Sequence, residues 1–280
     1  MMLVVVVVTR GKEEEEAEVV EYDFEVVAAY PHDAGAFTQG LECASPGCEV
    51  LLESTGLHGA SSVRRVATTT GTVLASSALP PALFGEGLTQ RGGVLYQTTW
   101  REGVLSCYDA ATLRLLARAP YTVAREGWGL AHDAEGRLVA SDGSSTLHVF
   151  AVGAAPALAQ RVVRRVPVRL RGRALPRLNE LEAARGRLWA NVWHADTLVE
   201  IDPATGAVVG TADLAALRAR PDCRAPARDV LNGIAYDAAA DEFLVTGKNW
   251  PVLYRLRLRP RSRPRSRSRP RQPSAHDAEL

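Results

Sequence analysis

The chain has 280 residues, and its 46% hydrophobic and 23% charged content is ordinary for a soluble globular protein with a core. Its formal net charge of +1 hides an asymmetry, because nine arginines occupy every odd position from Arg255 to Arg271. Without these nine charges the net charge would be −8, which argues against nucleic-acid binding by the folded part of the chain.

The N-terminal segment 1–17 is predicted to lie outside the folded domain, as an apolar and then acidic extension. Its apolar start, "MMLVVVVV", is too short to span a bilayer, and we predict no membrane span. It lacks the basic start and the small-residue cleavage site of a signal peptide, so it is a weak signal. The acidic run "KEEEEAE" that follows is expected to be solvated. The segment leaves the cellular compartment open.

A short sequence of similar character recurs five times along the chain. The copies are "QGLE" at Gln39, "EGLT" at Glu86, "WGLA" at Trp128, "NELE" at Asn179 and "NGIA" at Asn232. Their starting positions are 42 to 53 residues apart, and each copy precedes two further short segments rich in Val, Leu and Thr. Turn residues bound these segments, which is typical of strands, and four copies carry a fourth such segment.

Units of four strands that repeat about every 40–50 residues are typical of β-propellers, in which each unit forms one blade. We therefore predict an all-β protein, a five-bladed β-propeller that occupies residues 18–258. The last copy has no fourth strand of its own. The segment "AEVVEYDFEVVAAY", ahead of the first copy, is expected to complete the last blade and close the ring. A β-sandwich with coincidental spacing is the alternative.

Two local features fall within the repeats. Cys43 and Cys48 bracket the turn sequence "ASPG" in the first copy, so a disulfide that closes a small loop is sterically plausible. No pair of cysteines and no Cys/His spacing indicates a zinc site. The segment "ADLAALRAR" near Asp213 is the best short candidate for a helix.

The C-terminal residues 259–280 are predicted to be a disordered tail. Alternating Arg, Ser and Pro residues cannot build a packed core. A passive tail is the simplest interpretation of this composition. The alternative is a segment that is phosphorylated or that binds a polyanion.

Equivalent positions of the repeat should meet at the centre of a propeller, because the first strand of every blade lines the central channel. The first position of the tetrapeptide contributes Gln39, Glu86, Trp128, Asn179 and Asn232. A second set follows the second strand of each copy and contains Gly56, Trp100, Gly143, Trp193 and Lys248. A few polar groups in an aromatic hollow are typical of a small-ligand site.

Each of these residues also has a purely structural interpretation. The tryptophans could pack between blades, and Glu86 could hydrogen-bond to the backbone of a neighbouring blade. Asn191 and Asp142 are interpreted first as residues of turns or strand ends. His32 is expected to buttress the entry loop, because no second histidine or cysteine completes a metal site or a triad.

Several longer stretches resemble the plant- and bacterial-type glutaminyl-peptide cyclotransferases, or glutaminyl cyclases. The most specific are "YPHDAGAFTQGL", "FGEGLT", "EGWGLAHD", "LNELE" and "FLVTGKNWPVLY". The resemblance runs from about Tyr30 to Leu256 and touches all five copies of the repeat. The family is five-bladed. This chain departs from the family pattern in its cysteine-bracketed insertion and in a long arginine-rich segment from Ala151 to Pro176, interpreted as a linker.

The resemblance implies an acyltransferase that converts the N-terminal glutamine of peptides or proteins to pyroglutamate and releases ammonia. We also predict a monomer that needs no cofactor for catalysis. The implied pocket residues are Phe37, Gln39, Phe84, Glu86, Trp100, Trp128, Asn179, Trp193 and Lys248. A structural divalent ion in the propeller channel is left open, and the secretory pathway is slightly favoured because the family is often secretory.

The chemistry of cyclisation suggests a role for each of these residues. The aromatic side chains would enclose the aliphatic stem of the substrate and hold its amine against its carboxamide. Glu86 would act as general base and then as general acid, and Lys248 would stabilise the oxyanion. Gln39 and Asn179 would serve as amide donors or as anchors for the substrate. Burial would raise the pKa of Glu86 and Lys248 would lower it, so its ionisation state is left open.

Two other classes of function are compatible with a propeller. A lactonase or sugar-ester hydrolase would bind a central divalent ion, and Glu86, Asn179 and Asn232 could begin its ring of ligands. Lys248 and three tryptophans at the same mouth argue against a catalytic cation. A propeller that only binds its ligand would not need the pair of Glu86 and Lys248.

Overall fold

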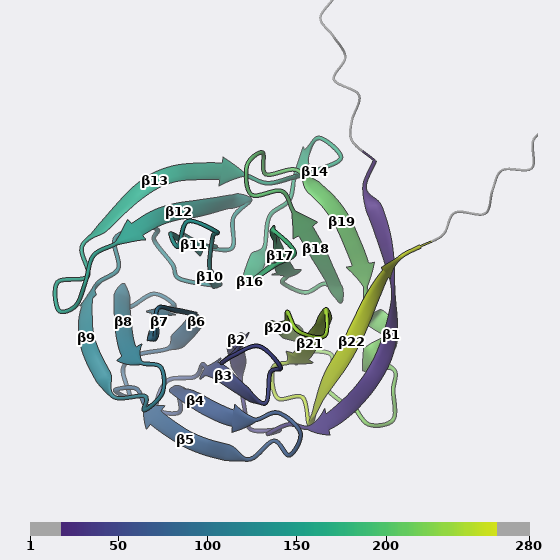
Figure 1. Cartoon of the computed structure of the whole chain (residues 1–280), viewed down its shortest axis with the longest axis horizontal. Coiled ribbons are helices and arrows are strands. Elements are labelled where there is room, and N and C mark those ends of the chain that lie inside the picture. The colour runs from purple at the N-terminus through teal and green to yellow at the C-terminus, as the bar shows by residue number, and fades with distance from the viewer. Residues whose placement is uncertain (1–17, 262–280) are drawn as a thin grey trace, which may run out of the picture.

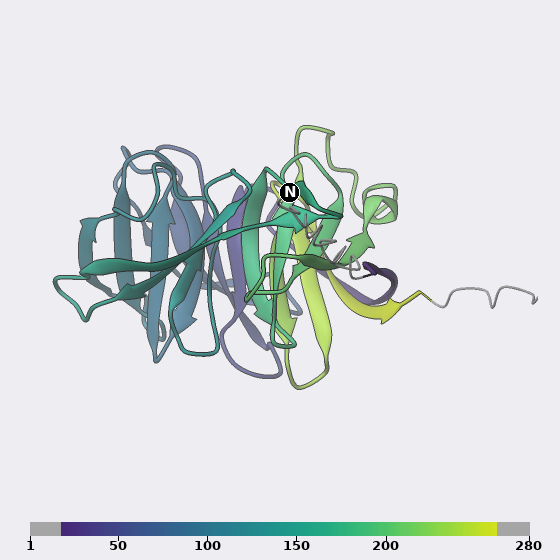
Figure 2. The same cartoon turned by 90° about the horizontal axis from the view of Figure 1, so that it is seen from above.

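The computed structural model describes residues 18–261, and most of them are in β-strands. The sheets surround a common centre (Figure 1), and the molecule is thinner along the axis of this ring than across it (Figure 2). Within the described residues the one helix, α1 (Ala215–Arg218), lies where a helix was predicted. None of residues 18–261 belongs to a helix long and apolar enough to cross a bilayer. The extension at 1–17 and the tail beyond 261 lie outside the described residues.

Three four-stranded antiparallel sheets follow one another along the chain. The first contains β2 (Thr38–Cys43), β3 (Val50–Thr55), β4 (Ser62–Ala67) and β5 (Val73–Ala78). The second contains β6 (Gly85–Arg91), β7 (Val94–Thr99), β8 (Val104–Asp109) and β9 (Leu115–Pro120). The third contains β10 (Leu130–His132), β11 (Leu138–Ala140), β12 (Thr146–Val152) and β13 (Gln160–Pro167). In each sheet the first strand lies nearest the centre and the last lies at the rim (Figure 1).

The remaining long strands form one eight-stranded sheet in the order β16-β17-β18-β19-β1-β22-β21-β20. Its strands are β1 (Val20–Pro31), β16 (Leu178–Ala184), β17 (Arg187–Val192), β18 (Thr197–Ile201), β19 (Val208–Asp213), β20 (Leu231–Asp237), β21 (Glu242–Gly247) and β22 (Val252–Pro260). β1 pairs antiparallel with β22 along nearly its whole length, and parallel with β19 only from Val20 to Tyr22. The first and last strands of the described chain therefore lie side by side.

Arginines at the end of β22 pair with acidic residues of β1. Arg259 contacts Glu25, and Arg261, just after the strand, contacts the two acidic residues nearest the start of β1. Alternate residues of a strand face the same side of the sheet. The first arginines of the C-terminal alternation therefore lie on one side of β22 and are part of the sheet. The strand ends at Pro260, two residues beyond the domain boundary predicted at Leu258.

The arginine-rich segment from Ala151 to Pro176 was wrongly predicted to be a linker. It contains β13, the outermost strand of the third sheet, and a small hairpin of β14 (Arg169–Leu170) and β15 (Arg173–Ala174). Most side chains of β13 are partly or fully exposed because the strand lies at the rim. Arginines therefore replace the apolar alternation that would have indicated a half-buried strand.

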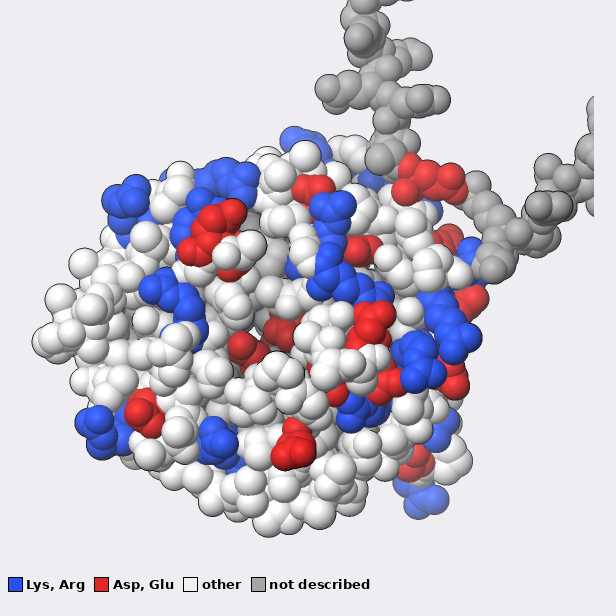
Figure 3. Space-filling model, viewed as in Figure 1, with Lys and Arg blue, Asp and Glu red and all other residues white. Residues whose placement is uncertain are grey.

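The hydrophobic core lies between neighbouring sheets. Leu52 and Val63 of the first sheet pack with Leu88 and Leu95 of the second, and similar clusters fill the other interfaces. The centre of the ring is left to the innermost strands, which carry many of the buried polar residues. The face seen in Figure 3 is hollowed at its centre, and acidic side chains lie inside the hollow.

Glycines of the repeated tetrapeptide let the innermost strands approach one another closely. A Cβ atom on Gly87 would lie 2.5 Å from the carbonyl oxygen of Trp128, and one on Gly129 would lie 2.0 Å from that of Asn179. No side chain tolerates such distances, so glycine is required at both positions. These glycines bring the residues beside them, at the first position of the tetrapeptide, close together.

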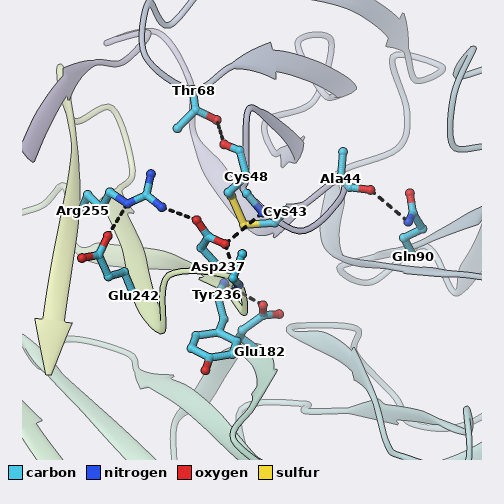
Figure 4. The surroundings of a disulfide bond; sticks show 12 residues. Cys43, Ala44, Cys48, Thr68, Gln90, Glu182, Tyr236, Asp237, Glu242 and Arg255 are labelled. Atoms are coloured by element: carbon cyan, nitrogen blue, oxygen red, sulfur yellow. Dashed lines mark hydrogen bonds and ion pairs between the residues drawn. A yellow bond between two sulfur atoms is a disulfide. The ribbon is translucent and has the colours of Figure 1, made fainter.

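Cys43 and Cys48 form the disulfide that the sequence allowed, in the loop after β2 (Figure 4). Within this loop the N–H of Gly47 donates to Oδ1 of Asp237 at 3.0 Å, and the same carboxylate accepts a hydrogen bond from Arg255. The disulfide loop therefore docks the first sheet onto the last repeat. It lies at the opposite end of β2 from the residues predicted to form the site.

Candidate active site

A cavity of about 310 Å³ is lined by residues from all five repeats. Its lining residues are Phe37, Gln39, Phe84, Glu86, Trp100, Trp128, Asn179, Trp193, His194, Arg228, Val230 and Lys248. The structure brings together all nine pocket residues that were predicted from the sequence, and it adds His194, Arg228 and Val230. The added residues lie outside the positions compared between repeats.

Most of these residues come from two neighbouring strand ends in each sheet. Glu86 lies at the start of β6, and Trp100 follows the end of β7, which pairs antiparallel with β6. Asn179 and Trp193 are related in the same way through β16 and β17, and Lys248 follows β21. The start of one strand and the end of its antiparallel neighbour lie at the same edge. The repeat therefore carries both predicted sets to one end of the ring.

Glu86 is held by a line of buried amide side chains. Its Oε1 accepts a hydrogen bond from Nε2 of Gln39 at 2.8 Å, and Oε1 of Gln39 accepts one from Nδ2 of Asn232 at 3.3 Å. Asn232 also donates to the carbonyl oxygen of Thr38 at 3.0 Å. Asn232 is fully buried and does not line the cavity, so it orients Gln39 from behind.

Burial dominates the ionisation of the two charged residues. It raises the pKa of Glu86 well above its usual value; the charge of Lys248 opposes this, and those of Glu102 and Glu126 reinforce it. Burial also lowers the pKa of Lys248, an effect that Glu86 partly offsets. The Lys248 Nζ lies 4.7 Å from the centre of the Phe37 ring, in a cation–π contact. Of the two influences on Glu86 that the sequence left undecided, burial is the larger.

Five aromatic side chains form most of the remaining wall. Phe84 contacts Phe37 edge-on at 6.1 Å between ring centres, and it contacts Trp100 at 5.5 Å. Trp128 and Trp193 are nearly perpendicular, with ring centres 5.4 Å apart. Trp193 is 37% exposed and marks the opening of the cavity. This wall encloses a space that suits an aliphatic chain and excludes most water.

Two glycines of the second predicted set make room for these rings. A Cβ atom on Gly56 would lie 2.3 Å from the ring of Phe84, and one on Gly143 would lie 2.7 Å from the ring of Trp128. A larger residue at either position would displace part of the aromatic wall. Positions that carry no reactive side chain therefore still shape the site.

The family model for glutamine cyclotransferases matches residues 1–258 of this chain. The chain belongs to the glutamine cyclotransferase family. It is 41% identical over 239 residues to the glutaminyl-peptide cyclotransferase of Arabidopsis thaliana, a match that covers 85% of this chain and 72% of that protein. It also resembles the crystal structure of Myxococcus xanthus glutaminyl cyclase, with a TM-score of 0.74 and 35% identity, over 88% of this chain and 100% of that one. The family predicted from the motifs is confirmed.

Sequence analysis of this cyclotransferase family member missed two carboxylates that hold the aromatic wall. Glu126 accepts hydrogen bonds from the Nε1 atoms of Trp100 and Trp128 at 2.9 and 3.1 Å. Glu102 accepts one from the backbone N–H of Phe84 at 3.3 Å. Glu126 stands two residues before Trp128, and Glu102 stands two residues after Trp100. Acids beside both predicted tryptophans were therefore the signal that could have found them.

Residues that were interpreted as structural lie outside the cavity. His32 is buried, and its Nε2 lies 3.0 Å from Oε1 of Glu53, in a cluster that supports the entry loop. The side-chain oxygen of Asn191 accepts a hydrogen bond from the N–H of Gly233 at 3.0 Å. Asp142 accepts hydrogen bonds from the turn that follows it. These contacts support the structural interpretations.

A metal-dependent site would need several charged ligands around one point. Among residues 18–261, no group of three or more His, Cys, Asp or Glu side chains is arranged to hold a metal ion. Asn232, one of the ligands considered for a central cation, is turned toward Gln39. The structural ion in the channel stays a prediction without assigned ligands.

Proposed function

We propose that the protein is a glutaminyl-peptide cyclotransferase, which converts the N-terminal glutamine of peptides or proteins to pyroglutamate and releases ammonia. One observation carries the proposal. Buried Glu86 and Lys248, which are far apart in the sequence, line one aromatic cavity in a member of this family. An acid and a cation in a space that excludes water match the needs of an intramolecular acyl transfer.

The cavity holds the glutamine side chain in a folded conformation. The reaction joins the α-amine nitrogen to Cδ of the same residue, so correct placement lowers much of the barrier. The aromatic wall encloses the two methylene groups between these atoms. Asn179 anchors the amine, because its buried Oδ1 has no hydrogen-bond partner among the described residues and can accept one from the substrate.

Glu86 moves the proton that the reaction requires. The neutral α-amine attacks Cδ, the new C–N bond forms, and Glu86 accepts one proton from the attacking nitrogen. Glu86 then gives this proton to the carboxamide nitrogen, which leaves as ammonia when its bond to Cδ breaks. Gln39 occupies Oε1, which leaves Oε2 to face the substrate. The raised pKa makes the carboxylate a stronger base and brings its pKa closer to that of an α-amine.

Lys248 stabilises the negative charge that develops on the substrate oxygen. Its ammonium group is buried, so its interaction with an oxyanion is screened less than it would be in water. Lys248 also holds its place against Phe37, at one end of the aromatic wall. We assign the oxyanion to Lys248 and the amine to Asn179 because the two side chains come from different repeats and face one cavity.

We further infer that the five repeats form the five blades of a β-propeller. In support, the eight-stranded sheet divides at the short parallel contact between β19 and β1 into two units of four strands. β1 would then be the outer strand of the last blade and would close the ring through its long pairing with β22. An experimental structure tests this count directly.

The activity is tested by incubating the purified protein with a dipeptide that begins with glutamine and measuring ammonia. We expect ammonia to be released in proportion to enzyme, and we expect the same dipeptide with a blocked α-amine to be inert. No release of ammonia, together with hydrolysis of a lactone that depends on an added divalent ion and stops with a chelator, would favour the hydrolase alternative. Binding of the dipeptide with no ammonia would indicate a non-catalytic propeller.

A further inference from the structure

The aromatic wall of the cavity consists of two separate groups of rings. Phe37, Phe84 and Trp100 form one group, in which Phe84 contacts the other two. Trp128 and Trp193 form the other. The N–H of Gly127 donates to the carbonyl oxygen of Trp100 at 2.9 Å, which joins the two backbones. Within residues 18–261 no ring contact connects Trp100 to Trp128, so this bond leaves the orientation of the two rings to their side-chain contacts.

Glu126 connects the two groups. Its Oε2 accepts hydrogen bonds from both indole Nε1 atoms, at 2.9 Å from Trp100 and 3.1 Å from Trp128. Its Oε1 accepts one from Nε of Arg101 at 2.9 Å, and the Arg101 guanidinium lies 3.9 Å from the centre of the Trp100 ring. Hydrogen bonds to an ionised acceptor are the stronger kind, so this arrangement restrains both rings.

Glu126 does not itself line the cavity. Trp100 follows β7 of the second sheet, whereas Trp128 precedes β10 of the third, so no shared strand fixes the distance between their rings. We propose that Glu126 is a positioning residue, which sets the width of the glutamine pocket by holding Trp100 and Trp128. This inference rests on the cyclotransferase activity proposed above.

The charge of Glu126 also acts on Glu86, which gives the proposal a second readout. Burial raises the pKa of Glu86 most, Lys248 lowers it, and the charges of Glu102 and Glu126 raise it further. Burial alone would raise the pKa of Glu126, but the hydrogen bonds from the two indoles and Arg101 outweigh this and lower it. Glu126 is therefore ionised in the range where Glu86 titrates.

Three variants test the proposal. Glu126→Ala removes the connection between the indoles and the charge, whereas Glu126→Gln removes the charge and keeps an oxygen that can accept from both indoles. Glu102→Gln is the matched control: it removes a charge that acts on Glu86 and keeps an oxygen that can accept from the N–H of Phe84, and Glu102 accepts no hydrogen bond from either indole. Two quantities are measured for each: kcat and KM for a Gln-initiated dipeptide across pH, and acrylamide quenching of tryptophan fluorescence without substrate.

We expect Glu126→Ala to raise KM by about tenfold, the effect of losing one charge-assisted contact, with a smaller change in kcat. Its tryptophans should be quenched more strongly than those of the parent. Glu126→Gln and Glu102→Gln should keep KM within about threefold, and both should move the acid limb of kcat/KM to lower pH, because each removes a negative charge that raises the pKa of Glu86.

An unchanged KM and unchanged quenching in Glu126→Ala would overturn the positioning role. If Glu126→Ala does not fold, Glu126→Leu, which fills the space but accepts no hydrogen bond, is measured in its place with the same expectations for KM and quenching. If the parent protein releases no ammonia, the proposed activity fails, whereas the quenching comparison still tests the positioning of the two rings.

Discussion

The innermost strands carry buried carboxylates in two regions that differ in their surroundings. Glu86 faces the cavity, whereas Glu42, Glu180 and Glu182 lie farther along the same kind of strand. Burial raises the pKa of all four, that of Glu42 to about 7. A raised pKa therefore does not distinguish the proposed catalytic acid from the others.

The hydrogen-bond donors do distinguish them. Glu180 accepts hydrogen bonds from the backbone N–H groups of Leu41 in β2 and Ile234 in β20, at 3.3 and 2.9 Å. Glu42 and Glu182 likewise accept backbone N–H groups of neighbouring innermost strands. Glu86 accepts its hydrogen bond from the side chain of Gln39 and faces the cavity. Acids bound to the backbone connect the strands, and the acid that faces a cavity is available for proton transfer.

The largest expected difference in kcat is between two variants that each replace one buried acid, one from each region. Glu86→Gln should lower kcat by about 10³-fold, because it removes the group that accepts and returns the proton. Glu180→Gln should leave kcat within about threefold, because Glu180 does not line the cavity and its replacement keeps one of the two backbone hydrogen bonds. Ammonia release and far-UV circular dichroism are measured for both. Comparable losses of kcat in the two folded variants would remove the distinction between the regions.

The stability of the protein should depend on pH through the structural acids. The pKa of Glu42 is about 7 in the folded protein and near 4.5 when unfolded, so the folded state binds more protons in between. The free energy of unfolding should therefore fall as pH rises from 4.5 to 7, by on the order of 3 kcal/mol from this group. Glu42→Gln should reduce this slope in urea titrations; a slope equal to that of the parent would contradict the assignment.

Replacing the buried cation should affect the cavity region alone. Lys248→Met should lower kcat by about 10²-fold through loss of oxyanion stabilisation. It should also move the acid limb of kcat/KM to higher pH, because the charge that lowers the pKa of Glu86 is gone. The pH–rate profile measures both. A fall in kcat with an acid limb at the parent's position would show that Lys248 does not act on Glu86.

The smallest effect should come from crowding the aromatic wall. Gly56→Ala places a methyl group against the Phe84 ring. We expect KM to rise by about fivefold with little change in kcat, because the substrate is bound less tightly in the ground state and the transition state alike. Gly153→Ala is the control, because its new Cβ would make only ordinary contacts, none closer than 3.4 Å. An equal KM in both variants would show that the ring of Phe84 is free to move.

Much of the site was predictable because it depends on local properties of the repeat. Each strand and turn can be recognised from a few consecutive residues. Antiparallel pairing of β6 and β7 then places Glu86 and Trp100 at the same end of their sheet without further information. The rim strand β13 was not predictable in this way, because an exposed edge strand has little apolar alternation to reveal it. Glu126 was missed for another reason: its partners include an indole from a different repeat.

The amino-acid sequence by itself determined the all-β character, the five repeats, the family and the nine residues that meet in the cavity. These depend on short-range patterns and on motifs that a single chain displays. Only the tertiary structure decided which buried acid faces open space, which amide supports another, and which carboxylate connects the tryptophans. Those outcomes depend on the directions of side chains from strands far apart in the chain, and only packing between the sheets sets these directions.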